Sequence, residues 1–425
     1  MCYLKTIYPT IIRKKFIINI LFSRGMGLIM KINLAVLFGG VSVEHEISII
    51  TALQAIRSLN KNKYNVIPIY ITKKNEFFTG DMLFDIENFR DISSLLSKSK
   101  QVYFIKKHTV GSGQSGLFIE GIKKGLLEKA FTQHIDVAFP IVHGTNVEDG
   151  TLQGFLEMLS LPYVGCDVTS SAAGMDKGIS KAVLKMNSIP VLDGVFFSSD
   201  EYFTDSAIII NKIEAACRYP VIVKPVNLGS SVGVGYAASR ESLIDAIENA
   251  VGYTDRIMIE NAVQNLLEIN CSVYGDSESA QASVCEEPVS AGDLLTFDAK
   301  YMGGGAKEGM SGSGRKLPAD IPADMSEKIQ KYAVDSFKAL GCAGVTRVDF
   351  LVDRLSGDIF VNELNTIPGS LSFYLWEASG LKYTDLLDGL VSLAFKRHRD
   401  RERINFSYDT GILENFKFGG SKKLK

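Results

Sequence analysis

The sequence has few of the residues that hold metals or disulfides. Its six cysteines form no CxxC pair, and its five histidines are scattered along the chain. A structural zinc site or a disulfide framework is therefore not expected, and we interpret the cysteines as small buried residues of a reducing compartment. No apolar run reaches the length of about 18 residues that a membrane-spanning helix needs.

The chain also lacks an excess of charge of either sign. Lys and Arg number 46 and Asp and Glu 48, which gives a formal net charge of -2. Without a basic surface, binding to nucleic acid is not expected. The 46% of hydrophobic and 22% of charged residues are typical of a globular protein. At about 150 residues per domain, the 425 residues predict about three domains.

The two ends of the chain differ from the rest. A basic cluster at residues 13–15 precedes a short apolar stretch that Asn19 interrupts, and no cleavage site of small residues follows. We interpret residues 1–29 as a disordered leader or as an extension ahead of a start at Met26 or Met30, with a targeting segment as the alternative. The polar and basic residues 399–425 are expected to form a loosely ordered tail.

Short apolar runs in the first third of the chain indicate a parallel sheet. Strands are predicted at 33–38, 65–72 and 135–142, with a helix between the first two. This order is typical of an open α/β sheet, in which ligands bind beyond the carboxyl ends of the strands. Gly39-Gly40 and His143-Gly144 are expected to lie at those ends. Residues 30–165 are therefore predicted to form an N-terminal α/β domain.

Two further units are predicted after residue 165. The unit 166–260 contains the strand 220–225, which Lys224 interrupts, and the glycine- and serine-rich loop 228–235. The unit 261–398 contains a long glycine-rich loop at 294–317, which we interpret as a lid because of its length. It ends with a predicted hairpin of strands 345–352 and 359–365.

The hairpin carries charged side chains on a face that its two strands can share. Alternation with period two puts Arg347 and Asp349 on one face of the first strand, and Glu363 and Asn365 on one face of the second. Carboxylate and amide oxygens of this kind suit Mg²⁺. A salt-bridge ladder with Arg347 is the alternative.

A second group of residues suits phosphates. The backbone amides of the loop Gly229–Gly233 can wrap a phosphate, and Lys177 and Lys224 can neutralise it. Either lysine alone could equally be a solvated charge. Four apolar neighbours favour burial of Lys224, however, and a buried ammonium needs an anion. The sequence contains neither GxxxxGK[ST] nor GxGxxG after the first strand, so two common nucleotide motifs are excluded.

Glu44 and His45 lie at the predicted start of a helix, beyond the first strand. There a carboxylate can bind a ligand or can interact with the helix dipole as a capping residue. His143 at the end of another strand is equally ambiguous by itself. A Ser-His-Asp hydrolase is not supported, because the GxSxG elbow is missing.

Taken together, these pieces resemble the D-alanine–D-alanine ligases of the ATP-grasp superfamily. The resemblance covers residues 31–395 and rests on six blocks in the family's order. They are LFGGVSVEHEIS (37–48), HGTNVEDGTLQG (143–154), GMDKGISK (174–181), VIVKPVNLGSSVGV (221–234), RVDF (347–350) and NELNTIPG (362–369).

The resemblance implies a fold, an activity and partners. The fold is α/β, with three domains: an N-terminal open parallel α/β domain followed by two α+β ATP-grasp subdomains that sandwich ATP. The activity is the ATP-dependent ligation of two D-alanines through an acyl phosphate, for peptidoglycan precursor synthesis. The implied protein is a cytoplasmic homodimer that uses ATP and two Mg²⁺ or Mn²⁺ ions per active site, and it binds neither nucleic acid nor a membrane.

The resemblance also gives roles to residues. Glu44 would bind the ammonium of the first D-alanine, with His143 nearby. Ser230 and Tyr301 would link Glu44 to the lid, and Arg347 and the Gly369 amide would stabilise the reacting groups. The metal ligands would be Asp349, Glu363 and Asn365. The ATP-binding residues would be Lys177, Lys224, Gly229, Ser230, Ser231, Glu260 at the adenine, Asn261, Glu268 at the ribose, and Lys300.

The chain departs from the family pattern near the substrates. Asn261 stands where a lysine is usual, His45 stands where an arginine is common, and the lid is unusually rich in glycine. SLSFYLWE follows Gly369 in place of a segment with threonine and two serines. In the family that segment holds the second substrate's carboxylate, so Ser370 or Ser372 is expected to do so here. D-serine or another second amino acid, and a non-catalytic nucleotide-binding protein, stay open as alternatives.

Overall fold

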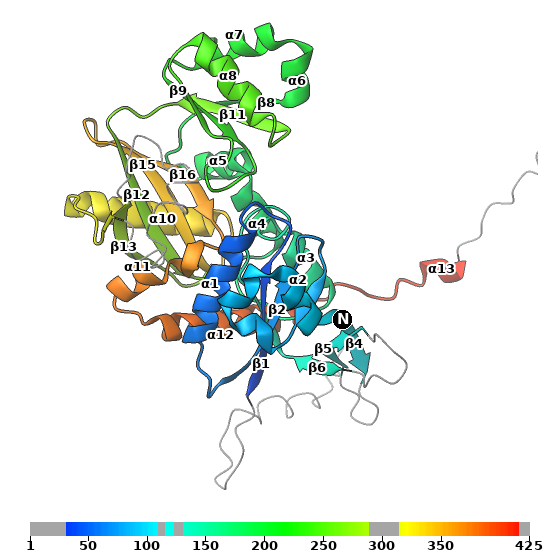
Figure 1. Cartoon of the computed structure of the whole chain (residues 1–425). Coiled ribbons are helices and arrows are strands. Elements are labelled where there is room, and N and C mark those ends of the chain that lie inside the picture. The colour runs from blue at the N-terminus through cyan, green and yellow to red at the C-terminus, as the bar shows by residue number, and fades with distance from the viewer. Residues whose placement is uncertain (1–30, 109–114, 123–130, 289–313, 416–425) are drawn as a thin grey trace, which may run out of the picture.

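The computed structural model describes residues 31–108, 115–122, 131–288 and 314–415, which form three β-sheets (Figure 1). The N-terminal sheet has the order β6-β5-β4-β3-β2-β1-β7. In it β1 pairs in parallel with β2 and β7, as predicted, and β3 to β6 extend the sheet with antiparallel pairs. The strands are β1 (Ile32–Gly39), β2 (Tyr64–Ile71), β3 (Phe77–Thr79), β4 (Lys100–His108), β5 (Ser115–Gly121), β6 (Thr132–Ile135) and β7 (Val137–Pro140).

The predicted strand 135–142 is wrong in one respect, because it is two strands that part at Asp136. The backbone N–H of Asp136 donates to the Asn33 carbonyl at 3.0 Å, and the Asp136 carboxylate accepts from the Asn33 N–H at 2.7 Å. These bonds fix the chain beside the start of β1. As a result β6 pairs with β5, whereas β7 pairs with β1. The break lies inside an apolar run, so periodicity gave no sign of it.

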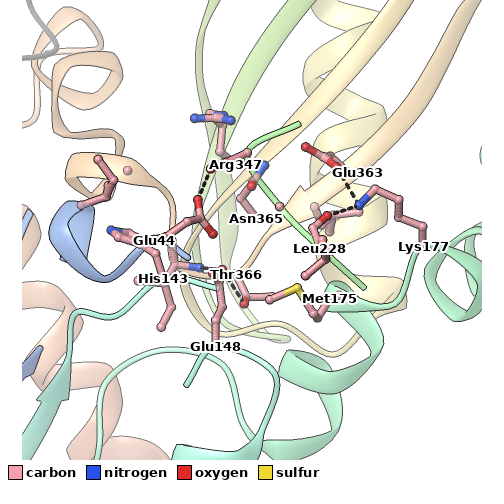
Figure 2. A pocket seen from close by; sticks show the side chains of 17 residues that line it. Glu44, His143, Glu148, Met175, Lys177, Leu228, Arg347, Glu363, Asn365 and Thr366 are labelled. Carbon is pink, nitrogen blue, oxygen red and sulfur yellow. Dashed lines mark hydrogen bonds and ion pairs between the residues drawn. The ribbon is translucent and has the colours of Figure 1, made fainter. Parts of the chain in front are cut away.

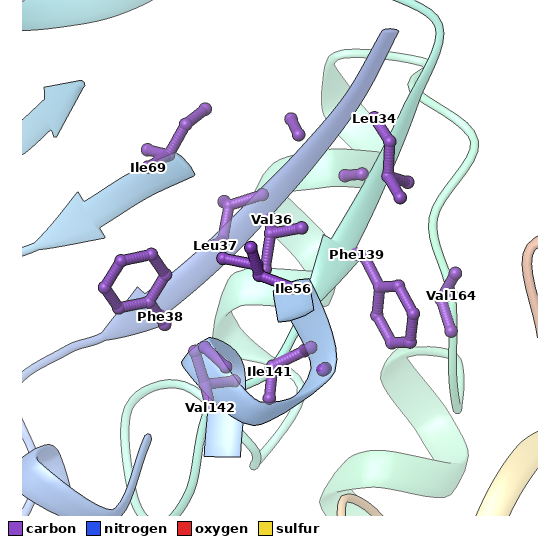
Figure 3. Packing of buried hydrophobic residues seen from close by; sticks show 14 of the residues in the cluster. Leu34, Val36, Leu37, Phe38, Ile56, Ile69, Phe139, Ile141, Val142 and Val164 are labelled. Carbon is purple, nitrogen blue, oxygen red and sulfur yellow. The ribbon is translucent and has the colours of Figure 1, made fainter. Parts of the chain in front are cut away.

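The centre of the N-terminal sheet is buried against helices from both ends of the chain. Residues Leu34 to Phe38 of β1 have no exposed surface, which explains their continuous apolar run (Figure 3). They share one core with α1 (His45–Ser58) and with α12 (Tyr383–Arg401), whose residues Leu386 and Leu390 are fully buried. Figure 1 shows α12 alongside α1. The last long helix thus completes the N-terminal core.

The second sheet is antiparallel and lies at the far end of the molecule from the N-terminal sheet (Figure 1). Its order is β10-β9-β11-β8, and it packs on helices α6, α7 and α8. The elements are β8 (Gly194–Ser198), α6 (Ser199–Thr204), α7 (Ser206–Ala216), β9 (Val221–Pro225), β10 (Gly235–Ala237), α8 (Arg240–Ala250) and β11 (Arg256–Asn261).

The third sheet is also antiparallel, in the order β14-β13-β12-β15-β16. Helix α10 covers its apolar face, which contains Val348, Phe350 and Val352. Alternation then directs Arg347 and Asp349 to the opposite face. The elements are β12 (Leu266–Gly275), β13 (Ala280–Pro288), β14 (Arg315–Lys316), α10 (Ala323–Ala339), β15 (Gly344–Asp353) and β16 (Ile359–Asn365).

Shorter elements connect the strands and sheets or follow the last long helix. No helix in the described ranges is long and apolar enough to cross a membrane. The connecting elements are η1 (Asp81–Phe84), η2 (Ile86–Arg90), α2 (Ile92–Lys98), α3 (Thr151–Met158), α4 (Val168–Met175), α5 (Lys177–Met186), η4 (Gly369–Ser372), α11 (Phe373–Ala378) and α13 (Ile412–Asn415).

Candidate active site

One cavity gathers residues from all three parts of the molecule. It is lined from the N-terminal part, from α4 and α5, from the loop after β9, and from β15 and β16 (Figure 2). The lining residues are Glu44, Ile47, His143, Glu148, Gly174, Met175, Lys177, Leu228, Gly229, Ser230, Arg347, Glu363, Leu364, Asn365, Thr366, Ile367 and Gly369. Nine of the predicted site residues therefore line the same space: Glu44, His143, Lys177, Gly229, Ser230, Arg347, Glu363, Asn365 and Gly369.

Glu44 joins the N-terminal part to the loop after β9. It is the N-cap residue of α1, but its side chain makes no capping hydrogen bond. Instead, its carboxylate accepts a hydrogen bond from the Ser230 hydroxyl. A glycine at position 229 gives the Glu44 carboxylate room beside the loop, because a Cβ on Gly229 would lie only 3.1 Å from Glu44 Oε2. Ser230 and Ser231 adopt left-handed φ angles of 54° and 58°, which curl the loop around this contact.

His143 is a buried, neutral histidine at the wall of the cavity. Its Nδ1–H donates to the Ile367 carbonyl at 2.9 Å, and its Nε2 accepts from the Thr51 hydroxyl at 3.0 Å. Burial lowers the pKa of His143 to about 4. Both ring nitrogens are thus committed to protein partners, which fixes the ring and its tautomer and leaves it uncharged near neutral pH.

Glu148 is a site residue that the sequence analysis missed. Its carboxylate accepts from the Gly144 N–H at 3.0 Å, the Ile367 N–H at 2.8 Å and the Thr366 hydroxyl at 3.1 Å. It thereby ties the loop after β7 to the end of β16. Burial, together with the charge of Glu44, raises the pKa of Glu148 to about 7.

The predicted polar face of the hairpin is present. Asp349 on β15 lies directly opposite Glu363 on β16, and Arg347 lies opposite Asn365. Arg347 donates to both oxygens of Asp349, at 2.6 and 2.7 Å, and Asn365 Nδ2 donates to Asp349 Oδ2 at 3.0 Å. The salt bridge with Arg347, which the sequence left as the alternative, is therefore present on this face.

The donor set on this face fits a hard cation. Two carboxylates and an amide oxygen on facing strands are ligands that Mg²⁺ accepts beside water and phosphate oxygens. Asp349 and Glu363 keep 14% and 23% of their side-chain surface exposed, and Glu363 and Asn365 line the cavity. Over the described ranges there is no group of three or more His, Cys, Asp and Glu side chains arranged for a metal. The fit thus depends on Asn365 as the third ligand.

The two predicted phosphate lysines differ in place and in partners, because Lys177 lines the cavity and Lys224 does not. Lys177 donates to the Leu228 carbonyl at 2.6 Å and lies 3.4 Å from Glu363 Oε2. Lys224 binds the Glu260 carboxylate and donates to Asn362 Oδ1 at 2.8 Å. Both lysines are buried, as expected for ammonium groups that face anions.

The remaining predicted residues fall into three groups. Glu260 is fully buried, Glu268 is half-buried on β12, and Asn261 is exposed, where its Oδ1 accepts from the Arg218 N–H at 2.8 Å. His45 is buried and bonded to Gly40 and Tyr70, which makes it a structural residue. The predicted lid residues Lys300 and Tyr301 lie outside the described residues.

Ser370 and Ser372 do not line the cavity. Ser370 donates from its hydroxyl to Gln54 Oε1 at 2.7 Å and from its N–H to Thr51 Oγ1 at 3.2 Å. Ser372 is fully buried, and its hydroxyl finds no hydrogen-bond partner in the described part of the chain. Residues 370–372 all have φ near +50°, an unusual left-handed turn for residues other than glycine.

The fold and this site define the class of the protein. A mixed α/β domain followed by two antiparallel sheets with a cleft between them is the ATP-grasp fold, as in the solved ligase structures that the chain resembles. The structure of the D-alanine–D-alanine ligase from Coxiella burnetii matches with a TM-score of 0.71 at 30% identity, over 88% of this chain and 96% of that one. The VanG D-Ala:D-Ser ligase from Enterococcus faecalis matches with a TM-score of 0.68 at 30% identity, over 86% of this chain and 100% of that one.

Sequence comparison narrows the class to a family. The family model described as D-ala D-ala ligase N-terminus matches residues 33–166, and that described as D-ala D-ala ligase C-terminus matches residues 183–392. The D-alanine–D-alanine ligase of Thermosipho melanesiensis is 39% identical over 90% of this chain and 98% of its own length. The chain belongs to the D-alanine–D-alanine ligase family.

Proposed function

We propose that the protein uses ATP to join two D-alanine molecules into D-alanyl-D-alanine for peptidoglycan precursor synthesis. The observation that supports this most is the convergence of three kinds of group on one cavity. A carboxylate suited to an amino group (Glu44), cations suited to phosphate (Lys177 and Arg347) and oxygens suited to Mg²⁺ (Glu363 and Asn365) all line it. Carboxylate activation by ATP needs these three groups together.

In the first step, a carboxylate oxygen of the first D-alanine attacks the γ-phosphorus of ATP. The bond between the γ-phosphorus and the bridging oxygen breaks, so ADP leaves and an acyl phosphate forms. Catalysis of such a transfer consists mainly of positioning and charge neutralisation. Glu44 would hold the ammonium of this D-alanine, while Lys177, Lys224 and the Gly229–Gly233 loop would hold the phosphates.

In the second step, the amine of the second D-alanine attacks the acyl carbon after losing a proton. A tetrahedral intermediate forms, and it collapses to the dipeptide and inorganic phosphate. Arg347 and the backbone N–H of Gly369 both lie at the cavity, and there they would stabilise the negative oxygen. His143 stays neutral and fixed, so we assign it to shaping the substrate site rather than to proton transfer.

Asp349, Glu363 and Asn365 would hold two Mg²⁺ or Mn²⁺ ions. Bound there, such an ion would neutralise charge on the phosphate oxygens. In the structure, Asp349 pairs with Arg347, and Glu363 pairs with Lys177. The positive charges of the site therefore have partners before any phosphate arrives.

We also propose domain limits and an assembly. The domains are residues 30–165, 166–260 and 261–398, with the ATP between the second and the third, and the protein acts as a homodimer in the cytoplasm. Size-exclusion chromatography with light scattering tests the dimer, because a particle of one chain's mass would contradict it.

The identity of the second amino acid is the least constrained part of the proposal. Ser370 and Ser372, the expected carboxylate ligands, lie away from the cavity, and the segment after Gly369 departs from the family pattern. A structural relative at 30% identity is described as a D-Ala:D-Ser ligase. We therefore keep D-serine as the second candidate.

The test is ADP release by the purified protein, coupled to a spectroscopic readout, with D-alanine, D-serine, L-alanine and D-lactate alone and in pairs. We expect release with D-alanine alone and a product with the mass of D-alanyl-D-alanine. If ADP is released only when D-serine is present, D-serine and not D-alanine is the second substrate. If no ADP is released with any of these four compounds at saturating ATP and Mg²⁺, the proposed ligase activity is contradicted. A non-catalytic nucleotide-binding protein would then be favoured.

A further inference from the structure

Lys181, which the proposed mechanism does not use, belongs to a buried group of charges. It lies one helical turn after Lys177 on α5, and its Nζ is 2.5 Å from Glu260 Oε2. The other oxygen of Glu260 binds Lys224. The three charged side chains come from α5, β9 and β11, and all three are buried. One glutamate is thus shared by two lysines.

This group carries one positive charge more than its carboxylate can balance. Glu260 has no exposed surface, so water does not screen it. Burial alone would raise the pKa of Glu260, but the charges of Lys224 and Lys181 outweigh burial and lower it. Burial also lowers the pKa of Lys181, with Lys224 adding to the effect, and the carboxylate of Glu260 opposes both. An excess buried cation needs a further anion.

The two lysines differ in what else they contact. Lys224 reaches across the cleft to Asn362 on β16, in the third sheet. Lys181 donates instead to the Leu192 carbonyl at 3.2 Å, just before β8 of the second sheet. Lys224 therefore bonds to both sheets, where a polyphosphate would enter, whereas the ammonium of Lys181 on α5 bonds to Glu260 and to the Leu192 carbonyl. Of the two lysines that bind Glu260, only Lys224 is placed to leave it for a ligand.

We propose that Lys181 is a positioning residue for the nucleobase, because it holds Glu260 ionised and in place when Lys224 turns to the phosphates. The proposal rests on the proposed function, in which Lys224 meets the phosphates, and on the contact with the adenine that the family resemblance implies for Glu260. An ionised carboxylate only accepts hydrogen bonds. Glu260 held in this way accepts from the 6-amino group of adenine and repels the 6-oxo group of hypoxanthine or guanine.

Loss of the Lys181 charge leaves Glu260 with Lys224 alone. If Lys224 then keeps its place beside Glu260, the phosphates lose a cation. If Lys224 leaves, the buried carboxylate takes up a proton and becomes able to donate to a 6-oxo group. Either outcome weakens ATP binding, and the second also weakens the preference for a 6-amino purine. A residue that only stabilised the fold would not change that preference.

The experiment compares ATP with ITP, which differ at position 6 of the base. Calorimetric titration gives both affinities without amino acids, so the result does not depend on ligase activity. Steady-state ADP release then gives KM and kcat. The variants are Lys181→Met, Lys181→Arg and Lys185→Met. Lys185 is the matched control, since it is the next lysine along α5 at the same spacing but has an exposed ion pair with Asp193 at 2.6 Å.

We expect Lys181→Met to weaken ATP binding and to reduce the ratio of ATP affinity to ITP affinity by about tenfold or more. The KM for ATP should rise much more than kcat falls. Lys181→Arg should recover most of the ratio, and Lys185→Met should match the wild type in every value. A lower unfolding temperature of Lys181→Met with an unchanged ATP to ITP ratio would overturn the proposal, because Lys181 would then be structural only.

A second comparison keeps the proposal testable if the single variant Lys181→Met does not fold. Glu260→Gln removes the buried acid, and the double variant removes both charges. We expect Lys181→Met to change the ATP to ITP ratio no further when Glu260 is already glutamine. A further change in that background would show that Lys181 acts independently of Glu260 and would also overturn the proposal. Absence of ligation by the wild type, with normal ATP selectivity, would contradict the proposed function alone.

Discussion

The buried carboxyl of Glu148 should make the stability of the protein depend on pH between about 4.5 and 7. Its pKa rises from an ordinary value of 4.5 to about 7 in the folded chain, first because of burial and then because of Glu44. The folded state therefore holds a proton that the unfolded state has released in this range. The free energy of unfolding must then fall as pH rises through it, and must level off above pH 7.

The size of the effect follows from the shift. Each pKa unit corresponds to about 1.4 kcal/mol, so the full window is worth about 3 kcal/mol. Between pH 5.5 and 8 the expected loss is about 2 kcal/mol. The variant Glu148→Gln keeps the size of the side chain but cannot ionise. It has one acceptor oxygen fewer for the donors of Gly144, Thr366 and Ile367. This loss lowers the free energy of unfolding by about 1–3 kcal/mol at every pH.

The assay is urea unfolding of both proteins at pH 5.5 and pH 8. Trp376 is the one tryptophan of the sequence, and it lies in the same buried cluster as Ile367, so its fluorescence reports on this part of the fold. We expect the wild type to lose about 2 kcal/mol relative to Glu148→Gln on going to pH 8. A difference between the two proteins that is equal at both pH values would refute the reasoning, because Glu148 would then be ionised throughout.

Three further results are expected. Asp349→Asn and Glu363→Gln should each reduce ligation roughly a thousandfold while leaving the fold intact, and near-normal turnover across a Mg²⁺ titration would contradict the metal assignment. A phosphinate mimic of the dipeptide should inhibit slowly and only with ATP, since its phosphorylated form resembles the tetrahedral intermediate; fast inhibition without ATP would argue against the acyl phosphate. Removal of residues 1–29 should leave ADP release unchanged, because β1 begins at Ile32, and a loss of activity or solubility would show that the segment is needed.

Features with a local cause could be predicted from the sequence. The shared face of Arg347, Asp349, Glu363 and Asn365 follows from strand alternation, which does not depend on the rest of the fold. The structure places Asp349 opposite Glu363 in register. Likewise the apolar run at 33–38 indicated a strand buried on both faces, and β1 is such a strand. A strand period and a continuous apolar run are properties of short segments.

Features with a distant cause could not be predicted. Lys177, Lys181 and Lys185 repeat at the same spacing on α5, yet Lys185 is exposed and Lys181 is buried. What separates them is the position of Glu260 on β11, which no local pattern reveals. Glu148 looks like a surface glutamate in a polar loop, and its partners Thr366 and Ile367 lie more than two hundred residues away. The role of each residue depends on the tertiary packing.

The shared core of β1 and α12 has a consequence for how the chain is made. The ribosome synthesises the N-terminal sheet first and α12 nearly last. The apolar surface that Leu386 and Leu390 cover in the folded protein is therefore exposed on the nascent chain during most of its synthesis. A nascent chain that stops after the N-terminal part would present this surface to chaperones or to other chains. The same dependence would limit recombination: an N-terminal part exchanged between relatives would need a last helix that matches it, even though the two segments lie at opposite ends of the gene.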